Sequence, residues 1–262
     1  GRSMNEKETL FAEERKDKIL QLLKDSEKVT VAQLCELFGI SPVTARNDLR
    51  DLENENLLRR THGGAIRMSS SAYELEPSKR DENTDQKKAI AAVAAEMVAD
   101  GDTIIIDTGS TCMEFAKLLS GKRNLRVVTN DLKIALLLDS CEDITLYLIG
   151  GVMRKHYNCT VGNFGSEPFR HLVVDKAFMG ANSLSASRGA MTPDVGQAEI
   201  KKTMLSVADK VIILCGSNKI GQNSFVTFAE LSDIDTLVTD SGLRRKLQES
   251  LEERGIDVKI AP

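Results

Sequence analysis

The sequence has few of the residues from which metal sites and disulfide frameworks are built. Only three histidines occur in 262 residues, His62, His156 and His171, and none is spaced with a second ligand on one helical face. The five cysteines are scattered through apolar stretches with no C-x-x-C spacing. We therefore expect five reduced cysteines in the core, no metal and no cofactor.

Long hydrophobic runs are also absent. No apolar stretch approaches the roughly 18 residues that a membrane-spanning helix requires. The N-terminal segment GRSMNEKETL lacks the apolar core of a secretion signal. A hydrophobic content of 41% is nevertheless enough to build a core. These features predict a soluble, cytoplasmic globular protein with no membrane partner.

Neither sign of charge is in large excess, and the distribution of charge matters more than its sum. The formal net charge is −4, but residues 1–67 hold 12 basic and 12 acidic residues, so the negative excess belongs to residues 68–262. The segment LLRRTHGGAIR holds Arg59, Arg60 and Arg67 and no acidic residue. Because nucleic-acid binding needs a basic face rather than a basic average, the net charge does not exclude a DNA partner.

The N-terminal region has the pattern of three short helices. Apolar residues at helical spacing predict the first over roughly residues 13–25. A second helix follows Thr30, a candidate N-cap, and stops at Gly39. A third starts with Ser41 as its N-cap and Pro42 at its first position, where the missing N–H costs nothing. Helix, glycine-containing turn and helix in this order predict a helix-turn-helix.

The third helix has two dissimilar faces. Rotation by about 100° per residue places Ala45, Leu49 and Leu52 in one apolar stripe. The opposite side carries Val43, Arg46, Asn47 and Arg50. These side chains offer donors to base edges and phosphates, and a small apolar group to a thymine methyl.

A charged helix side opposite an apolar stripe is usually only solvated. The interpretation as a DNA-reading face therefore depends on the preceding helix and on the segment RRTHGGAIR that follows. That segment predicts a two-stranded wing, which turns at Gly63 and Gly64 and places arginines against the DNA backbone.

The composition changes after residue 67. Residues 68–83 are polar and include a serine run and Pro77, which predicts a linker between a winged helix-turn-helix domain at 4–67 and a second domain at 84–262. In the second domain, short aliphatic strands alternate with helices. We therefore expect an α/β fold with a mainly parallel sheet, in which ligands bind at the carboxyl ends of the strands.

Several of these strand ends carry polar residues. In IIIDTGSTCMEF, Gly109, Ser110 and Thr111 stand between a buried strand and a helix start, where backbone N–H groups and hydroxyls suit an anion. A plain strand-to-helix turn with a capping hydroxyl explains these residues equally well. The segment lacks the Gly-Lys-Ser/Thr ending of a nucleotide-hydrolysing P-loop. Other strand ends carry Asn130, Gly151, Arg154 and Lys219. A plain turn also explains Gly150-Gly151, and a loop lysine such as Lys219 is more often only solvated.

The segment ERKDKILQLLKDSEKVTVAQLCELFGISPVTARNDLRDLENENLLRRTHGGA resembles the winged helix-turn-helix of the DeoR family of bacterial sugar-metabolism regulators. The runs TARNDL and RRTHGGA are the most specific parts of the resemblance. The family implies double-stranded operator DNA as a partner. The residues expected to contact it are Ser41, Val43, Thr44, Arg46, Asn47, Arg50, Arg59, Arg60 and His62.

The second domain resembles the DeoR effector domain, whose fold is similar to that of ribose-5-phosphate isomerase. The segments GDTIIIDTGST, LIGGVMRK, DKAFMGA, AEIKK and SNKIG occur in the order found in that domain. Two departures, at Asn182-Ser183 and at Gly216, leave open which polar contacts select the ligand. The resemblance implies that a phosphorylated sugar or similar metabolite is surrounded by Asp107, Gly109, Ser110, Thr111, Asn130, Gly151, Arg154, Glu199, Lys202 and Lys219.

The expected function is a transcriptional repressor of a carbohydrate-metabolism operon whose second domain senses a phosphometabolite. The alternative is a sugar-phosphate isomerase with an accessory DNA-binding module. Isomerisation needs a positioned carboxylate base, and MGANSLS, which corresponds to the isomerase's Asp-Gly-Ala-Asp-Glu stretch, has no carboxylate. We therefore expect no enzymatic activity. We also expect a homo-oligomer, because twofold proteins read palindromic sites.

Overall fold

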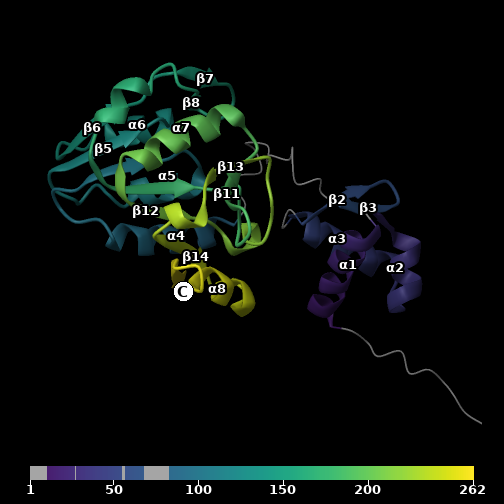
Figure 1. Cartoon of the computed structure of the whole chain (residues 1–262). Helices are drawn as coiled ribbons and strands as arrows, with labels where there is room; N and C mark the ends of the chain where they lie inside the picture. The colour runs from purple at the N-terminus through teal and green to yellow at the C-terminus, as the bar shows by residue number, and fades with distance from the viewer. Residues whose placement is uncertain (1–10, 27, 55–56, 68–82) are drawn as a thin grey trace, which may run out of the picture. The chain divides into compact units, whose positions relative to one another are not determined.

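The computed structural model describes residues 11–26, 28–54, 57–67 and 83–262 (Figure 1). These residues form two compact units, which divide at residue 69. The predicted linker at 68–83 lies outside the described residues except for its last position, Asn83. Each unit has its own buried hydrophobic residues.

The first unit contains the three predicted helices, α1 (Ala12–Ser26), α2 (Val31–Phe38) and α3 (Pro42–Asn54). Thr30 begins α2 with a capping box, in which its hydroxyl accepts from the Gln33 N–H and the Gln33 side chain accepts from the Thr30 N–H. Gly39 ends this helix at φ 66°, a left-handed conformation that glycine adopts without steric cost. Ser41 begins α3 by accepting a hydrogen bond from the Thr44 N–H at 3.1 Å. The predicted helix-turn-helix is confirmed.

The wing has three strands where the sequence predicts two. β2 (Leu58–Thr61) and β3 (Gly64–Arg67) form the expected hairpin, and β1 (Lys28–Thr30) pairs with β3 on its other side. Gly64 permits this close approach, because a Cβ at that position would lie 2.0 Å from the Val29 carbonyl oxygen. The sequence does not reveal β1, because three residues are too few to show the alternation of a strand.

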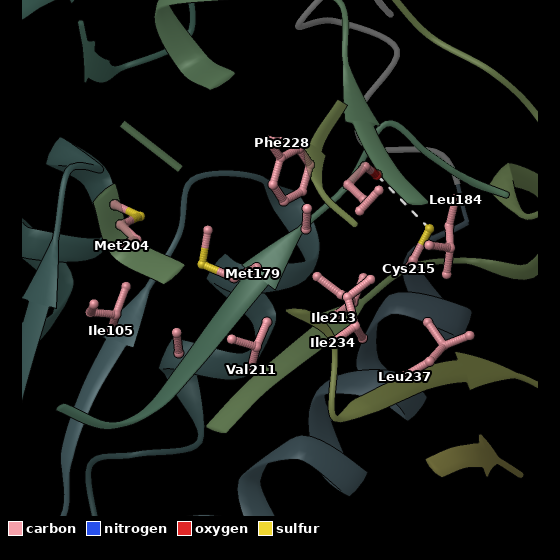
Figure 2. Packing of buried hydrophobic residues seen from close by; sticks show 14 of the residues in the cluster. Ile105, Met179, Leu184, Met204, Val211, Ile213, Cys215, Phe228, Ile234 and Leu237 are labelled. Carbon is pink, nitrogen blue, oxygen red and sulfur yellow. Dashed lines mark hydrogen bonds between the residues drawn. The ribbon is translucent and has the colours of Figure 1, made fainter. Parts of the chain in front are cut away.

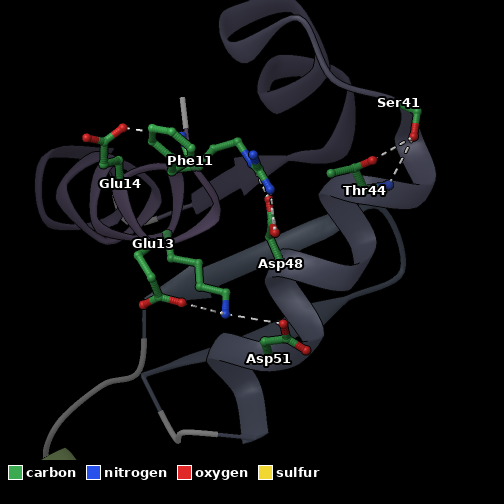
Figure 3. A network of polar contacts seen from close by, with 9 residues as sticks. Phe11, Glu13, Glu14, Ser41, Thr44, Asp48 and Asp51 are labelled. Atoms are coloured by element: carbon green, nitrogen blue, oxygen red, sulfur yellow. Dashed lines mark hydrogen bonds and ion pairs between the residues drawn. The ribbon is translucent and has the colours of Figure 1, made fainter. Parts of the chain in front are cut away.

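A buried ion pair joins α1 to α3 inside the first unit. Asp48, labelled in Figure 3, accepts from the Arg15 guanidinium at 2.6 Å (Nε) and 3.0 Å (Nη2). The hydrogen bond to Asp48 raises the pKa of Arg15, against the opposing effect of burial. Because removal of either partner leaves a buried charge unpaired, the pair fixes how the two helices pack. The surrounding apolar core consists of Ile19, Leu23, Val29, Leu34, Ala45, Leu49, Leu52, Leu58 and Ala65.

Seven parallel strands form the central sheet of the second unit, in the order β15-β14-β12-β9-β4-β5-β6. Along the chain, β4, β5 and β6 succeed one another toward one edge, and β9, β12, β14 and β15 succeed one another toward the other. The strand order therefore reverses between the neighbours β4 and β9, and the carboxyl ends of strands at such a reversal border the ligand site of open α/β sheets. The bounds are β4 (Thr103–Ile106), β5 (Leu125–Thr129), β6 (Ile144–Leu148), β9 (Val174–Gly180), β12 (Ala208–Leu214), β14 (Thr236–Asp240) and β15 (Asp257–Ala261).

Alternate residues of these strands face opposite sides of the sheet. In β4, Ile104 and Ile106 enter one buried cluster and Ile105 enters the other. The helices α4 (Thr84–Glu96), α5 (Ser110–Lys117) and α6 (Leu132–Leu138) cover the side of Ile104 and Ile106. Figure 2 shows the opposite cluster, which α7 (Val195–Ser206) and α8 (Arg245–Glu252) cover. The predicted mainly parallel sheet with helices on both faces is confirmed.

Shorter elements complete the second unit. β10 (Ser183–Ser185), β11 (Gly189–Thr192) and β13 (Val226–Ala229) form an antiparallel sheet, and β7 (Val152–Arg154) pairs with β8 (Cys159–Val161). The 3-10 helices are η2 (Glu167–His171), η3 (Ser217–Lys219) and η4 (Leu231–Asp233). The sequence pattern does not reveal these strands or β15, because none has the continuous aliphatic run that marks a strand such as β4.

The five cysteines are free thiols. Cys112, Cys159 and Cys215 are buried as expected, whereas Cys35 and Cys141 are only half-buried. Burial is the main cause that raises the pKa of Cys215 to about 11. Within the part of the chain that the structure describes, no helix is long and apolar enough to cross a membrane, and no three potential metal ligands cluster together.

A second buried ion pair ties three elements together at the reversal of strand order. Asp107, which follows β4, is fully buried, and Lys201 of α7 is 3% exposed. Asp107 Oδ2 accepts from Lys201 Nζ and from the Gly180 N–H (3.0 Å) at the end of β9. Lys201 Nζ also donates to the Gly180 carbonyl oxygen (3.0 Å) and lies 4.8 Å from the centre of the Phe228 ring. The pair therefore joins β4, β9 and α7.

Two adjacent lysines on α7 provide a matched test of this pair. Lys201→Met should lower the free energy of unfolding by about 3 kcal/mol, because it leaves the Asp107 carboxylate buried without its partner. Lys202→Met removes the same charge from an exposed position and should change it by no more than about 0.5 kcal/mol. Urea unfolding of the full chain, followed by circular dichroism, measures both. Equal effects of the two substitutions would show that the ion pair does not stabilise the unit.

Candidate functional site

The predicted DNA-reading face lies on the solvent side of α3. Arg46, Asn47 and Arg50 are exposed and Val43 is 64% exposed, whereas Ala45 on the other side is buried. Neither arginine has a hydrogen bond or ion pair with another described residue. The donors of this face are therefore available to a partner.

Two hydroxyl groups lie at the start of the same helix. The side chains of Ser41 and Thr44 hydrogen-bond to each other at 3.0 Å (Figure 3). The Ser41 hydroxyl also caps the helix through the Thr44 N–H. Both predicted DNA contacts are thus held at the N-terminus of α3, where backbone N–H groups also favour a phosphate.

The wing adds a second group of exposed basic residues. Arg59 and Arg60 are neighbours on β2, so their side chains leave opposite faces of the strand, and His62 lies in the turn that follows. Arg60 Nε binds Glu53 Oε2 at 2.7 Å, whereas Arg59 has no partner among the described residues. One arginine of the wing is therefore anchored and the other is not.

In the second unit, the start of α5 has no side-chain cap, whereas the starts of two neighbouring helices are capped. Gly109 precedes α5 at φ 127°, and no described side chain caps this helix start. By contrast, the carboxylates of Asp131 and Asp194 cap α6 and α7. A Cβ on Gly109 would meet open space. The unused N–H groups and the hydroxyl-bearing Ser110 and Thr111 therefore stand next to a space that an anion can enter.

Two buried acceptors at adjacent strand ends have no partner. Asp107 Oδ1 and Asn130 Oδ1 accept no hydrogen bond from any described residue. The remaining groups are well held: Asn130 Nδ2 donates to the Thr160 carbonyl oxygen (2.7 Å), and Thr108 Oγ1 donates to Asp131 Oδ2 (2.7 Å). Because buried oxygens in proteins are nearly always hydrogen-bonded, two unused acceptors indicate a polar site.

Lys219 brings a positive charge to this region. It ends η3, and its side-chain ammonium has no hydrogen-bond or ion-pair partner among the described residues. Burial raises the pKa values of Cys112 and Cys215, and the Lys219 ammonium acts in the opposite direction on both. Cys112 lies in the first turn of α5.

Two further predicted residues lie at β7: Gly151 immediately precedes this strand, and Arg154 is its last residue. Arg154 Nε lies 3.7 Å from Asp194 Oδ2, and its guanidinium carbon lies 3.8 Å from the centre of the Tyr157 ring. Gly151 packs against β8, where a Cβ would come within 3.0 Å of the Val161 carbonyl oxygen. Arg154 already has a carboxylate nearby, which makes Lys219 the more available cation.

Two predicted residues of α7 lie away from the buried pair. Glu199 and Lys202 are exposed, whereas Lys201 between them carries the buried ammonium. Sequence reasoning missed Lys201, although the helical repeat contains the signal: Gln197, Lys201 and Met204 are spaced by four and three residues and share one buried face. The structure therefore adds Lys201 to the candidate site.

Two family models match the chain in succession. Residues 15–71 match the DeoR-like helix-turn-helix domain, and residues 82–241 match the DeoR C terminal sensor domain. The HTH-type transcriptional regulator GlpR of Haloferax volcanii is 35% identical over 246 residues, which cover 94% of this chain and 96% of that protein. The putative aga operon transcriptional repressor of Escherichia coli O157:H7 is 30% identical over 256 residues, which cover 97% of this chain and 95% of the relative.

Among solved structures, D-ribose-5-phosphate isomerase in complex with phospho-erythronic acid has a TM-score of 0.40 and 20% identity, covering 52% of this chain and 53% of that one. This distant likeness says nothing about activity. Both family models match in order, and full-length relatives align along almost the entire chain. The chain belongs to the DeoR family of DNA-binding transcriptional regulators.

Proposed function

We propose that this regulator represses a carbohydrate-metabolism operon and that a phosphorylated sugar or related metabolite controls its binding to operator DNA. The observation that carries the proposal is the open start of α5, which stands at the reversal of strand order beside two unused buried acceptors. The name of the aga operon repressor among the relatives supports the same pathway class.

The site offers the two kinds of group that a sugar phosphate needs. The N–H groups before Ser110 and Thr111 and the ammonium of Lys219 are donors for a phosphate. Asp107 Oδ1 and Asn130 Oδ1 are acceptors for sugar hydroxyls. The charge of Asp107 does not exclude an anion, because Lys201 neutralises it.

The proposed effector contacts are the residues predicted from the sequence. Lys201 is not one of these contacts but holds Asp107 in place. Gly109 lets the backbone approach the phosphate, and the exposed Glu199 and Lys202 are the outermost members. The full set is Asp107, Gly109, Ser110, Thr111, Asn130, Gly151, Arg154, Glu199, Lys202 and Lys219.

The proposed DNA contacts are the exposed residues of α3 and the wing. A homo-oligomer is part of the proposal, because one reading helix covers few base pairs and a twofold pair of heads reads a palindrome. The residues are Ser41, Val43, Thr44, Arg46, Asn47, Arg50, Arg59, Arg60 and His62.

We do not assign catalysis to the second unit. The relatives are named as transcriptional regulators. Asn182 and the buried Ser183 stand where the isomerase stretch has carboxylates, and a proton abstraction needs such a base.

A substitution at the open helix start tests the effector site. Gly109→Val should weaken binding of a sugar phosphate at least about tenfold, because valine is strained at φ 127° and occupies the space that the phosphate needs. Calorimetry with pentose and hexose phosphates and the matching free sugars measures this. Gly121→Val is the control, since Gly121 also faces open space and has no positive φ. Wild-type affinity in Gly109→Val, or equal wild-type affinity for sugar and sugar phosphate, would contradict the proposal.

A substitution on α3 tests the reading face. Arg46→Ala should cost roughly 1–3 kcal/mol of operator affinity and relax the preference at one base pair, as expected if this arginine bonds a guanine. The operator is first obtained by selection from random duplexes with the wild-type chain. Arg245→Ala is the control, because it removes the same charge from an exposed position of α8 in the other unit. Identical affinities and base preferences for the two variants would remove Arg46 from the interface.

A further inference from the structure

Glu53 lies in the last turn of α3 and is bound to the wing through both of its carboxylate oxygens. Oε1 accepts from the Arg60 main-chain N–H at 2.9 Å, and Oε2 accepts from Arg60 Nε at 2.7 Å. Both side chains remain partly accessible, with 29% of Glu53 and 43% of Arg60 exposed. One acidic residue therefore holds both the backbone and the side chain of a wing arginine.

The way in which Arg60 is held leaves its outer edge unused. A guanidinium has five N–H groups, and here only the Nε edge binds Glu53. No other described residue bonds the Arg60 side chain. The two terminal nitrogens are thus free, and they form the planar fork that binds a phosphate through two parallel hydrogen bonds.

The main-chain bond has a separate consequence for the wing. Arg60 lies in β2, so its N–H bond to Glu53 fastens this strand to the end of the reading helix. The neighbouring Arg59 has no such anchor among the described residues. This bond therefore adds to the core packing of Leu58 and Ala65 in holding the wing against α3.

We propose that Glu53 is a positioning residue that presents the Arg60 fork, and the wing that carries it, to the DNA backbone next to the bases read by α3. This inference rests on the proposed contact between Arg60 and DNA. An isolated acid beside DNA repels the phosphates, but the positive charge of Arg60 offsets the charge of Glu53. The two bonds from Arg60 to Glu53 also restrict the Arg60 side chain before DNA binds, so less conformational entropy is lost on binding.

The test compares five variants of the full chain on the selected operator and on random duplex, over a range of salt concentrations. Glu53→Gln keeps an oxygen for the Arg60 N–H but loses the charged bond to Nε. It should lower operator affinity about five- to tenfold and reduce the salt slope by about one unit, as Arg60→Ala does. Affinity for random duplex should fall by a similar factor, because a phosphate contact carries no sequence information. The double variant, which combines Glu53→Gln with Arg60→Ala, should bind no more weakly than Arg60→Ala alone, because the two residues act as one unit.

Glu13→Gln on α1 is the control, because it removes the same charge from an exposed position of the same unit. Glu53→Asp, whose shorter carboxylate cannot reach both groups, gives a second measurement with the charge retained and should also weaken operator binding.

Two results would overturn the inference about Glu53 alone: operator binding by Glu53→Gln that equals or exceeds the wild type while Arg60→Ala binds weakly, or additive losses in the double variant. Unchanged binding by Arg60→Ala would instead remove the DNA contact on which the inference rests. Circular dichroism and hydrogen exchange of the first unit establish that each variant is folded.

Discussion

The buried carboxylate of Asp107 is the constraint on which the second unit depends. A charge at that depth is stable only when it is paired and hydrogen-bonded, and Lys201 and the Gly180 N–H meet this requirement. Their contacts join the ends of β4 and β9 to α7, at the point where the strand order reverses. The open start of α5 and the unused Oδ1 of Asp107 lie at the same place, so the interaction that holds the fold together also shapes the site.

In the proposed function, this arrangement lets one region serve both stability and recognition. The Oδ2 atom of Asp107 is fully used within the protein, whereas Oδ1 is left without a partner. A ligand hydroxyl that bonds Oδ1 and a phosphate at the start of α5 are the groups that such a site is equipped to bind. For the ligand to regulate, it must have different affinities for the DNA-binding and non-binding states, since equal affinity shifts no equilibrium.

The sequence predicts some parts of the molecule well for identifiable reasons. Thr30, Gly39 and Pro42 mark helix ends by local chemistry, and the apolar spacing of α3 separates Ala45 from Arg46 without any knowledge of the fold. By contrast, β1 exists only because Gly64 lets Val29 approach, which is a contact between distant segments. Lys201 and Glu53 were missed for the same reason: each looks like an ordinary charged helix residue until its partner, Asp107 or Arg60, is seen beside it.

The central claim is that occupation of the second unit by a phosphorylated metabolite changes the affinity of the first unit for DNA. Fluorescence anisotropy of the wild-type chain on its selected operator, repeated with each sugar phosphate and its unphosphorylated counterpart, measures this coupling directly. The account predicts that one phosphorylated compound weakens operator binding by a coupling free energy of about 1–3 kcal/mol, and that its unphosphorylated counterpart does not. If no compound alters operator affinity, or if the free sugar acts as strongly as its phosphate, the account is contradicted.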